Sequence, residues 1–512
     1  MAERSILIVG AGVGGLAAGC YARMNGYPTR ILEMHGVSGG VCTGWMRGGY
    51  VFDGCIHNLA GTSPSSRFHR MWRELGVIPR RLMQPHAEMV RVERPDGEPL
   101  VIWANLDRLE SEMKRLFPSD GAAIGELIGA ARRLRDLDLL GLAMADRAER
   151  LRALAYAPLL ARWGSVTMER YAERLRDPFL RRAFPSLVYD WPHQPVAVFL
   201  TFLAGLHDGD FGWPVGGSYA LAKAMEDRFI ELGGELSRHA RVVRILTRDD
   251  RAVGVRLSDG TEEHADVVIS NAYGPATVFD LLGGAYLSRA VERYYSRPVD
   301  RVEMGLQISL GVDRDLSGEP HAIVLPLAQP AVIAGEARSR LYVEPFGFDP
   351  SLAPPGKSAL KVMLATSYSR WERLRQNPEA YRQEKQAAAE AVIRLLEPRF
   401  PGIGGQVEMV DVATPMTTFR YTGNGRGFEA PMTRMALALF TGRRLSQTLP
   451  GLRDFYMVGQ WAGLPGVSTC AAMGRDVVRA VCRSHGRAFT AEIPPETVAE
   501  RLADRARAAH LA

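Results

Sequence analysis

Cysteine is scarce in this sequence, and the few cysteines form no recognisable pattern. The chain has 512 residues and only five cysteines, at positions 20, 42, 55, 470 and 482. A sparse and odd-numbered set without C-x-x-C spacing argues against a disulfide scaffold and against a cysteine–histidine metal site. A reducing cytoplasm is the simplest interpretation of this composition.

A strong charge of one sign and a long membrane-type apolar run are also lacking. The 63 Lys and Arg residues exceed the 57 Asp and Glu residues by six, and 46% of the chain is hydrophobic. This composition is that of a globular protein and excludes a disordered or collagen-like chain. Residues 5–22 carry no charge but hold five glycines, so we expect neither a membrane span nor a secretion signal there.

The N-terminal residues do carry a dinucleotide-binding fingerprint. A β-branched run precedes G-A-G-V-G-G at residues 10–15, and a helical stretch and a second strand ending in Glu33 follow. Glycines at such a turn let the backbone approach a pyrophosphate, which the helix N-terminus attracts. Glu33 is placed to bind a ribose hydroxyl, so the pattern favours FAD or NAD over NADP.

The next segment resembles one group of flavoproteins. The pair Gly39-Gly40 follows Glu33, and residues 49–57 read G-Y-V-F-D-G-C-I-H. Together these motifs resemble the FAD-dependent phytoene desaturase, carotenoid isomerase and retinol saturase group of the amine-oxidase-like flavoproteins. Many members have Arg directly after the glycine pair, where this chain has Val41, so the phosphate contact of that Arg is absent.

Residues 451–475 resemble the C-terminal flavin motif of the same group. A short strand is expected to end at Gly459, and a helix is expected to begin near Gly466 and Val467. The N-terminus of this helix would stabilise negative charge on a reduced flavin. Gln460 stands where many members have Asp, and it keeps a hydrogen-bonding group without the charge.

The order of these motifs predicts an α/β protein with α+β insertions. Apolar strands are expected at 240–246, 252–257 and 265–271, after a helix at 219–232 with Ser218 as its N-cap. A Rossmann-like FAD-binding domain would then be interleaved with a substrate-binding domain. We expect the first to combine residues 1–75, 214–275 and 445–486, the second residues 76–213 and 276–444, and a tail at 487–512.

The resemblance implies FAD as the cofactor and names the residues expected to bind it. They come from both ends of the chain and from the strand at 240–246, whose backbone would touch the adenine. They are Gly10, Gly12, Val13, Gly14, Gly15, Glu33, Met34, Gly39, Gly40, Val41, Val243, Gly459, Gln460, Gly466 and Val467.

The resemblance also implies an oxidoreductase acting on C=C or CH–CH bonds of an apolar, isoprenoid or polyene-like small molecule. Hydride or electron transfer at flavin N5 would serve desaturation, saturation or redox-neutral isomerisation. The sequence leaves these three reactions open, as it does the electron acceptor or donor. The acid–base candidates are His57 and Tyr421, the latter in a Thr-Pro segment at 414–424 that resembles the family's lining of the flavin face.

Two functions of other kinds stay open. An amine or amino-acid oxidase would need an aromatic pair beside the flavin, with Trp461 as one member, and an Arg that binds a carboxylate. A non-catalytic escort protein would use the same nucleotide fold without a sealed pocket. Because one fold serves several functions, the fold alone does not choose among them.

Residues 130–182 alternate arginine with leucine, alanine and aromatic residues. Such a basic amphipathic stretch fits either the solvated face of packed helices or a peripheral contact with an anionic membrane. Nucleic-acid binding also uses arginines, but no recognised module accompanies them, so we expect no nucleic-acid partner.

Overall fold

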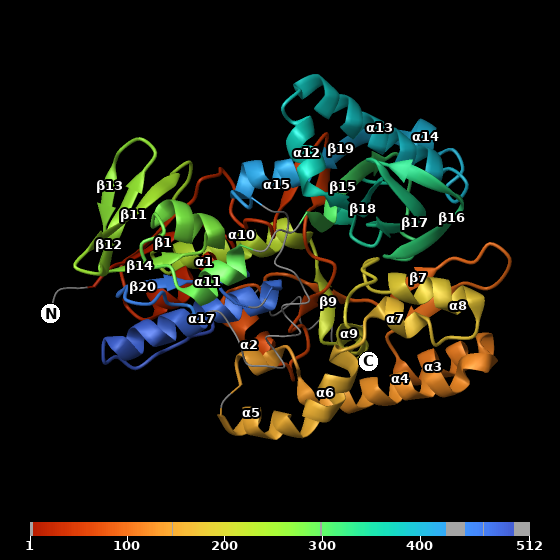
Figure 1. Ribbon diagram of the computed structural model, residues 1–512, viewed down its shortest axis with the longest axis horizontal. Helices are drawn as coiled ribbons and strands as arrows, with labels where there is room; N and C mark the ends of the chain where they lie inside the picture. Colours follow the sequence, from red (N-terminus) through yellow and green to blue (C-terminus); the bar gives the residue numbers. More distant parts are fainter. Residues whose placement is uncertain (1–3, 146, 297–299, 426–445, 464, 496–512) are drawn as a thin grey trace.

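The computed structural model describes residues 4–145, 147–296, 300–425, 446–463 and 465–495. In Figure 1 a sheet built around β1, with helices α1 and α17, lies to the left. A larger sheet around β15–β18 lies to the upper right, and helices α3–α9 lie below it. The described part of the chain therefore forms distinct lobes.

A five-stranded parallel sheet forms the left lobe. Its order is β10-β2-β1-β14-β20. The strand β1 has all four residues buried, as expected for a central parallel strand covered on both faces. Three separated parts of the chain supply the strands: β1 (Ile6–Val9), β2 (Thr29–Leu32), β10 (Glu235–Ser237), β14 (Val267–Ser270) and β20 (Phe455–Met457).

Three helices accompany this sheet: α1 (Val13–Met24), α10 (Gly217–Glu231) and α17 (Val467–Ser484). The helix α1 begins inside the glycine motif, earlier than the sequence suggested, because Gly12 serves as its N-cap. The helices α1 and α17 pack closely, since a Cβ at Gly474 would lie 2.5 Å from the Gly14 carbonyl oxygen. The first turn of α1 thereby lies against the middle of α17.

The expected N-cap of α10 was wrong. Gly216, with φ of 87°, is the N-cap, and Ser218 lies inside the first turn. A glycine takes the cap position because the chain enters the helix in a left-handed conformation that side chains disfavour. Ser218 instead bonds to a buried carboxylate of the site.

A small antiparallel sheet, β11-β12-β13, adjoins the five-stranded sheet. Its strands are β11 (Val242–Arg248), β12 (Arg251–Leu257) and β13 (Glu262–His264). Two further small sheets pair β3 (Gly44–Arg47) with β4 (Tyr50–Asp53), and β5 (Leu59–Ala60) and β6 (Met83–Pro85) with β9 (Phe211–Pro214).

A seven-stranded sheet, in the order β19-β15-β18-β17-β16-β7-β8, forms the upper right lobe. Helices α12 (Tyr368–Leu374), α13 (Pro378–Leu396) and α14 (Ile403–Gln406) cover one of its faces (Figure 1). Both expected insertions contribute to this sheet. The strands are β7 (Glu88–Val92), β8 (Leu100–Trp103), β15 (Arg301–Val312), β16 (Ile323–Ile333), β17 (Glu336–Pro345), β18 (Ser358–Ser367) and β19 (Val407–Ala413).

The remaining helices belong mainly to the first insertion. No helix in the described ranges combines the length and apolar character that a membrane span requires. The remaining helices are α2 (Arg67–Glu74), α3 (Leu106–Leu116), α4 (Gly121–Leu134), α5 (Arg147–Ala153), α6 (Ala157–Gly164), α7 (Met168–Ala172), α8 (Pro178–Ala183) and α9 (Val196–His207), with α11 (Arg289–Tyr295) and α15 (Pro415–Thr422) further along the chain. Most of the expected tail, at 496–512, lies outside the described residues.

Candidate functional site

A cavity of about 1650 Å³ is lined by residues of both large sheets and of the helices between them. Ordinary small-molecule pockets measure roughly 300–1,000 Å³. The volume therefore suffices for a dinucleotide together with a second ligand.

The glycine turn forms one end of this cavity. Gly10 has φ of +95°, a conformation that other residues rarely adopt. A Cβ at Gly14 would lie 2.8 Å from the side-chain amide of Asn271 and 3.1 Å from the Gly459 nitrogen. The turn is therefore a cradle that side chains would fill, at the N-terminus of a helix whose first N–H groups have no partner within the helix.

Gly15 is the exception among the expected cofactor residues, because it does not line the cavity. A Cβ there would lie 2.1 Å from the Gly10 carbonyl oxygen. Gly15 therefore packs against the turn from behind while its neighbours face the cavity, and its role in cofactor binding stays a prediction. The remaining fourteen expected cofactor residues all line the cavity.

Asn271 is a site residue that the sequence interpretation missed. It follows the end of β14, and its side-chain oxygen accepts hydrogen bonds from the backbone N–H groups of Gly12 at 3.2 Å and Gly15 at 3.3 Å. An amide side chain thus stabilises the glycine turn from the neighbouring strand. A polar residue at the carboxyl end of a strand beside β1 was the available signal.

Glu33, at the end of β2, is buried, yet both carboxylate oxygens are used. Oε2 accepts from the Ala11 N–H at 2.7 Å, and Oε1 accepts from the His35 N–H at 2.8 Å. Burial raises the pKa of Glu33, and these backbone donors oppose that shift. Each carboxylate oxygen keeps a further lone pair, so a ribose hydroxyl can still be bound.

The second glycine pair lies against the turn. Gly39 pairs with Gly12 in an isolated β-bridge, and its N–H donates to the Ala11 carbonyl at 2.8 Å. Its φ is +113°, and a Cβ would lie 2.3 Å from the Cys42 carbonyl oxygen. The pair Gly39-Gly40 therefore closes the dinucleotide end through backbone contacts. These contacts do not depend on the side chain at Val41.

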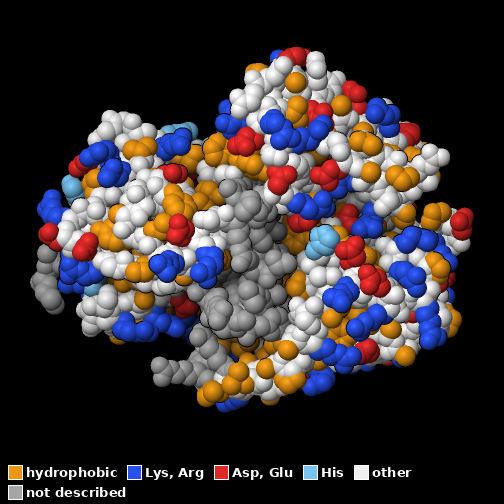
Figure 2. Space-filling view, in the orientation of Figure 1, with side chains coloured by type: hydrophobic (Ala, Val, Ile, Leu, Met, Phe, Trp, Pro, Cys, Tyr) orange, Lys and Arg blue, Asp and Glu red, His pale blue; other side chains and the backbone are white. Residues whose placement is uncertain are grey.

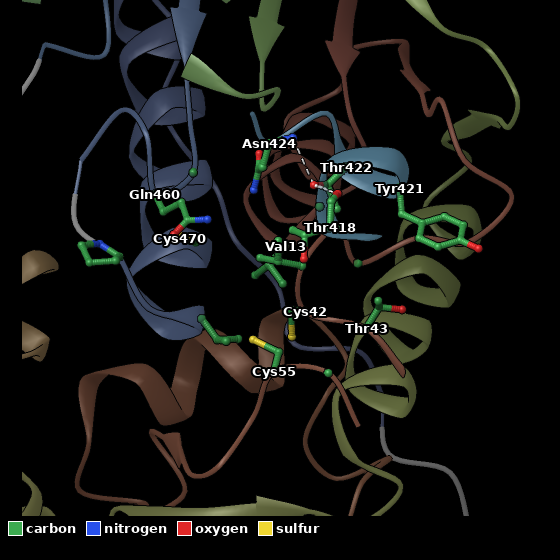
Figure 3. A pocket seen from close by; sticks show the side chains of 18 of the residues that line it. Val13, Cys42, Thr43, Cys55, Thr418, Tyr421, Thr422, Asn424, Gln460 and Cys470 are labelled. Atoms are coloured by element: carbon green, nitrogen blue, oxygen red, sulfur yellow. Dashed lines mark hydrogen bonds between the residues drawn. The ribbon is translucent and has the colours of Figure 1, made fainter. Parts of the chain in front are cut away.

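The C-terminal motif approaches from the opposite side of the turn. Gly459, with φ of +87°, ends the segment after β20, and Gly466, with φ of +113°, is the N-cap of α17. Gln460, Gly466 and Val467 line the cavity. Figure 3 shows Gln460 and Val13 on neighbouring sides of this space. Two helix N-termini therefore face one region of the cavity, an arrangement suited to an anionic ligand.

Tyr421 lies toward the dinucleotide end, on α15. Its ring contacts His35 edge-on, with 4.7 Å between centroids, and 37% of the side chain is exposed. In Figure 3 the phenol points away from Val13. Since His35 follows closely after Glu33, Tyr421 lies near the expected ribose site, a location better suited to closing the pocket than to proton transfer.

Asp53, the Asp of the G-Y-V-F-D motif, helps to hold the loop that carries His57. Its buried carboxylate accepts from the Ser218 N–H at 2.6 Å and from the Ser218 hydroxyl at 3.0 Å. The Ile56 N–H donates to the Ser218 hydroxyl oxygen at 2.9 Å. Burial raises the pKa of Asp53, which Lys361 and these donors oppose. The first turn of α10 therefore fixes the loop that carries His57.

His57 itself bonds to a residue that the sequence interpretation missed. Its Nδ1 lies 2.5 Å from Glu344 Oε1, and Lys361 Nζ lies 3.1 Å from Glu344 Oε2. Burial acts to raise the pKa of Glu344, but His57 and Lys361 outweigh it and lower the pKa to about 2. Lys361 within the apolar strand β18, and Glu344 after the apolar run at the end of β17, were the available signals.

The other end of the cavity is apolar and aromatic. Trp191, Met304 and Met363 form a buried cluster with Tyr189 packed against it. Tyr189 and Met304 have φ of 52° and 49°, unusual for side-chain-bearing residues. Strained residues of this kind cluster at ligand sites. A long apolar ligand could bury its surface against these side chains, and such burial is favourable.

Three cysteines also line the cavity, and Figure 3 shows the sulfurs of Cys42 and Cys55 facing each other. Contact with Cys42 and burial raise the pKa of Cys55 well above its ordinary value, and burial raises that of Cys470 to about 12. Cys55 and Cys470 are therefore protonated at neutral pH and unsuited to nucleophilic chemistry. The described residues hold no cluster of metal ligands either.

The aromatic pair expected of an amine oxidase takes another form here. Trp461 contacts Tyr273 edge-on, with 4.7 Å between centroids and 89° between the rings. Two rings in mutual contact leave no slot between them for an amine. This geometry disfavours the amine-oxidase alternative.

Comparison with known proteins bears on the same features. Residues 8–75 match the NAD(P)-binding Rossmann-like domain model. The chain is 26% identical to prolycopene isomerase 2 of an Oncidium hybrid cultivar, over 89% of this chain and 80% of that protein. It is 25% identical to a lycopene-forming phytoene desaturase of a Paracoccus species, over 91% of this chain and 95% of that protein.

The chain is a homologue of carotenoid isomerases and desaturases. The resemblance seen in the sequence is thus confirmed, and the chain is an enzyme of the FAD-dependent oxidoreductase type. Among solved structures, an oxidoreductase from Methanosarcina mazei shares the fold, with a TM-score of 0.60, 17% identity, and coverage of 93% of this chain and all of that one. The predicted mixed α/β fold with a Rossmann-like domain is confirmed as well.

Proposed function

We propose that this enzyme acts on a C=C or CH–CH unit of an apolar, polyene-like small molecule, by desaturation, saturation or isomerisation. One observation carries the proposal: a single cavity joins a glycine-lined dinucleotide cradle to an apolar end formed by Tyr189, Trp191, Met304 and Met363. Most of the surface of this end is apolar, which suits a hydrocarbon better than an amine or an amino acid.

The residues that we propose for FAD are those expected from the sequence, with Asn271 added as the residue that orients the glycine turn. The N-termini of α1 and α17 would hold the pyrophosphate and the ring's reducible edge, Glu33 the ribose, and Val243 the adenine. When bound, FAD supplies the ring that exchanges hydride or electrons with the substrate. The FAD-binding unit would comprise 1–75, 214–275 and 445–486, and the cover 76–213 and 276–444.

We propose His57 as the acid–base residue rather than Tyr421. His57 is nearly buried, lines the cavity and lies on the same side as Tyr189, whose ring stacks on it at 4.2 Å. Tyr421 is half-buried and beside His35. Replacing Tyr421 by Phe should leave turnover within about twofold, because the phenol performs no proton transfer there.

Purified protein mixed anaerobically with candidate substrates tests the function. The protein should carry a flavin absorbance spectrum, and phytoene or prolycopene should change either the flavin's redox state or the polyene's spectrum. Putrescine and amino acids serve as the comparison set. A flavin-free protein, or a flavin reduced by amines and unaffected by both polyenes, would contradict the proposal.

We also propose that this cytoplasmic enzyme meets its apolar substrate at an anionic membrane surface. The helices α5 and α6 form the lower edge of the molecule, where Figure 2 shows hydrophobic side chains among basic ones. Leu151 and Leu154 are 67% and 64% exposed, and Arg152 lies exposed between them. Leu139 and Leu140, shortly before α5, line the cavity.

Two arginines of the expected basic stretch form ion pairs within the protein and do not point to a membrane. Arg132 pairs with Asp107 at 2.6 Å and with Glu110 at 2.7 Å, and Arg135 pairs with Asp208 at 2.8 Å. These arginines therefore stabilise contacts between helices. The exposed leucines are the better candidates for insertion into a lipid headgroup layer.

Flotation with vesicles of phosphatidylcholine and phosphatidylglycerol tests this contact. The double variant Leu151→Glu/Leu154→Glu should float at least about fivefold less than the wild type, because two leucines that would insert into the lipid are lost and two negative charges are repelled by the anionic headgroups. Val332→Glu, at an exposed residue of β16, is the control. Equal flotation of all three proteins would reject this surface.

A further inference from the structure

The cavity opens to solvent at a mouth between the two lobes. Met46, in β3, and Arg375, the C-cap of α12, are exposed to solvent, yet both line the cavity. Figure 1 places α12 and α15 side by side where the upper right lobe faces the left lobe. Side chains at this mouth are therefore accessible from solvent and face the same cavity as the apolar end.

The mouth carries a net positive charge. Arg47 and Lys385 line the cavity beside the carboxylate of Asp411, in β19, and Arg47 Nε lies 3.4 Å from Asp411 Oδ2. Burial lowers the pKa of Lys385, an effect that Asp411 opposes and that Arg47 reinforces. Arg375 adds a third cation to these groups. Three cations and one carboxylate would attract an anion into the mouth.

Two of these cations are held on aromatic rings. Lys385 Nζ lies 5.7 Å from the centroid of the Tyr381 ring, and Arg375 Cζ lies 5.3 Å from the centroid of the Phe419 ring. Among the described residues, no carboxylate forms an ion pair with Lys385 or Arg375. A ring orients a cation through its face and takes up none of its N–H donors, which stay available to a ligand.

The first turn of α15 brings these two cations to the same place. The hydroxyl groups of Tyr381 and Thr414, the N-cap of α15, lie 2.6 Å apart. Arg375 Nη1 lies 3.7 Å from Met416 Sδ, two residues further along. Arg375 and the ring beneath Lys385 therefore both contact one helical turn, which fixes the two cations on the same side of the cavity.

Lys385 differs from the other basic residues of its own helix, α13. Arg382 pairs with Glu379 at 2.5 Å, and Arg394 approaches Glu390 at 3.9 Å. Neither arginine lines the cavity, whereas Lys385 does. The helix thus supplies carboxylates to its solvent-facing cations and leaves the one that faces the cavity for a ligand.

A row of sheet residues joins the mouth to the apolar end. Ala413 of β19 lies opposite Gln307 of β15, and Gln307 lies opposite Met363 of β18. All three line the cavity, as does Asp411, two residues before Ala413. Neighbouring strands are about 4.8 Å apart, so the row spans about 10 Å. A chain extended along the row would lie with one end on Met363 and the other near the cations.

We propose that the substrate is an amphiphile, an isoprenoid or polyene chain that ends in a carboxylate or phosphate group, and that Arg375 and Lys385 bind this anionic end. The inference rests on the proposed function and narrows its substrate class. A guanidinium presents paired N–H donors to a carboxylate or phosphate, and an ammonium adds a mobile charge. Arg47 pairs with Asp411 and so reduces its repulsion of the anion.

An anionic anchor solves a problem that apolar contacts leave open. A polyene repeats its unit along the chain, and hydrophobic contacts are non-directional, so they do not determine which unit lies at the flavin. An end group held at the mouth would fix the chain at one position along the cavity. Arg375 and Lys385 would thereby determine which C=C or CH–CH unit reacts.

The first experiment compares two ligands that share one polyene chain. Equilibrium dialysis of the flavin-bound full-length protein measures the Kd of all-trans-retinoic acid and of all-trans-retinol at about pH 8, where the carboxyl group is ionised. The acid should bind at least about tenfold more tightly, because charge-assisted hydrogen bonds form only with it. Raising the salt from about 0.05 M to 0.5 M should weaken the acid at least about threefold and leave retinol unchanged. Equal affinities for the two ligands would overturn the inference without recourse to any variant.

The second experiment removes the two cations. Arg375→Met/Lys385→Met should weaken retinoic acid at least about tenfold and change retinol by less than about twofold. Arg382→Met is the matched control, since it removes one charge from the outer face of α13 and should leave both affinities unchanged. A preference for the acid that survives in the double variant would overturn the assignment of these residues.

Further ligands identify the source of the anion. Farnesyl diphosphate should bind at least about tenfold more tightly than farnesol if the mouth accepts phosphate as the end group of a chain, and retinoic acid should compete with it. Inorganic pyrophosphate that binds at the mouth without any gain for either anionic chain would reject the amphiphile in favour of a free anion. Vesicle flotation that falls in the double variant, with retinoic acid binding unchanged, would assign the cations to a lipid surface instead.

These outcomes are distinct from a failure of the proposed function. A protein that binds no flavin, or that converts no polyene with or without an anionic end, contradicts the proposed function. A protein that converts phytoene or prolycopene and shows no preference for the acid contradicts only the anionic anchor.

Discussion

The two ends of the cavity are built by opposite means. The dinucleotide end is built around glycines: a Cβ at Gly12, Gly14 or Gly459 would lie within 2.8 Å of the Asn271 side chain, and one at Gly39 would lie 2.3 Å from the Cys42 carbonyl oxygen. The substrate end consists of side chains: Tyr189, Met304 and Met363 pack there, and His57, Glu344 and Lys361 bury charge beside them. An end made of backbone tolerates no added atom, whereas an end made of side chains can be altered piece by piece. Substitutions should therefore affect the two ends independently.

The largest effect is expected from separating the buried charges of the substrate end. Lys361→Met leaves Glu344 ionised without its cation, which should lower the free energy of unfolding by about 3–5 kcal/mol. The double variant Lys361→Met/Glu344→Gln should recover most of this loss. Urea unfolding measures both. A single variant as stable as the wild type would show that the pair is not coupled.

The next effect concerns the dinucleotide end. Gly14→Val places a side chain against Asn271 and Gly459, so FAD affinity should fall on the order of 100-fold, about 2.7 kcal/mol. The purified variant should be nearly colourless, as its absorbance spectrum will show. Gly129→Ala, in α4 where an added Cβ meets nothing, is the matched control and should bind FAD normally.

The strand β9 lies between the two ends, and Asp210 immediately before it makes stability depend on pH. Burial raises the pKa of Asp210 to about 7. Its contribution is therefore complete below about pH 4 and is lost as pH rises through 7. Asp210→Asn should stabilise the protein on the order of 2 kcal/mol at pH 8 and hardly at pH 4, as measured by urea unfolding at both pH values.

Asp208→Asn is the control for this pH dependence, since Asp208 is paired with Arg135 at the surface. It should change stability by less than about 1 kcal/mol at either pH. Equal gains from Asp210→Asn at both pH values would contradict the assigned cause.

The smallest effect tests the apolar cluster. Met363→Ala removes part of the substrate contact, so KM for a polyene should rise about tenfold, roughly 1.4 kcal/mol, with FAD affinity unchanged. Steady-state kinetics and flavin titration measure the two quantities separately. Weaker flavin binding in this variant would show that the two ends are not independent.

The sequence was most informative where function depends on local backbone geometry. The glycine turn, Glu33 and the helix after Gly466 are each contiguous with the strand or helix that positions them, so short motifs identified them. The structure places these residues along one cavity, apart from Gly15, whose missing side chain allows close packing against Gly10. A motif indicates that a glycine is required but does not indicate on which side the ligand lies.

The sequence was least informative about residues that become neighbours only through the pairing of strands in a sheet. Glu344 and Lys361 lie 17 positions apart and become partners only through the register of β17 and β18, and His57 reaches them from a loop nearly 300 residues earlier. Ser218 was predicted as a cap because serine favours that position, but the left-handed entry at Gly216 moved it inward to Asp53. The preference of serine for the N-cap position was overridden because the buried carboxylate of Asp53 needed hydrogen-bond donors.

The sequence by itself determined the cofactor class, the Rossmann-like fold and the kinship with carotenoid isomerases and desaturases, because glycine turns and strand–helix order are written in consecutive residues. Only the tertiary structure decided which side chains share the substrate end and which carboxylate is paired with His57. Those facts depend on strand register and on desolvation by distant segments, and neither quantity is a property of any short stretch of chain.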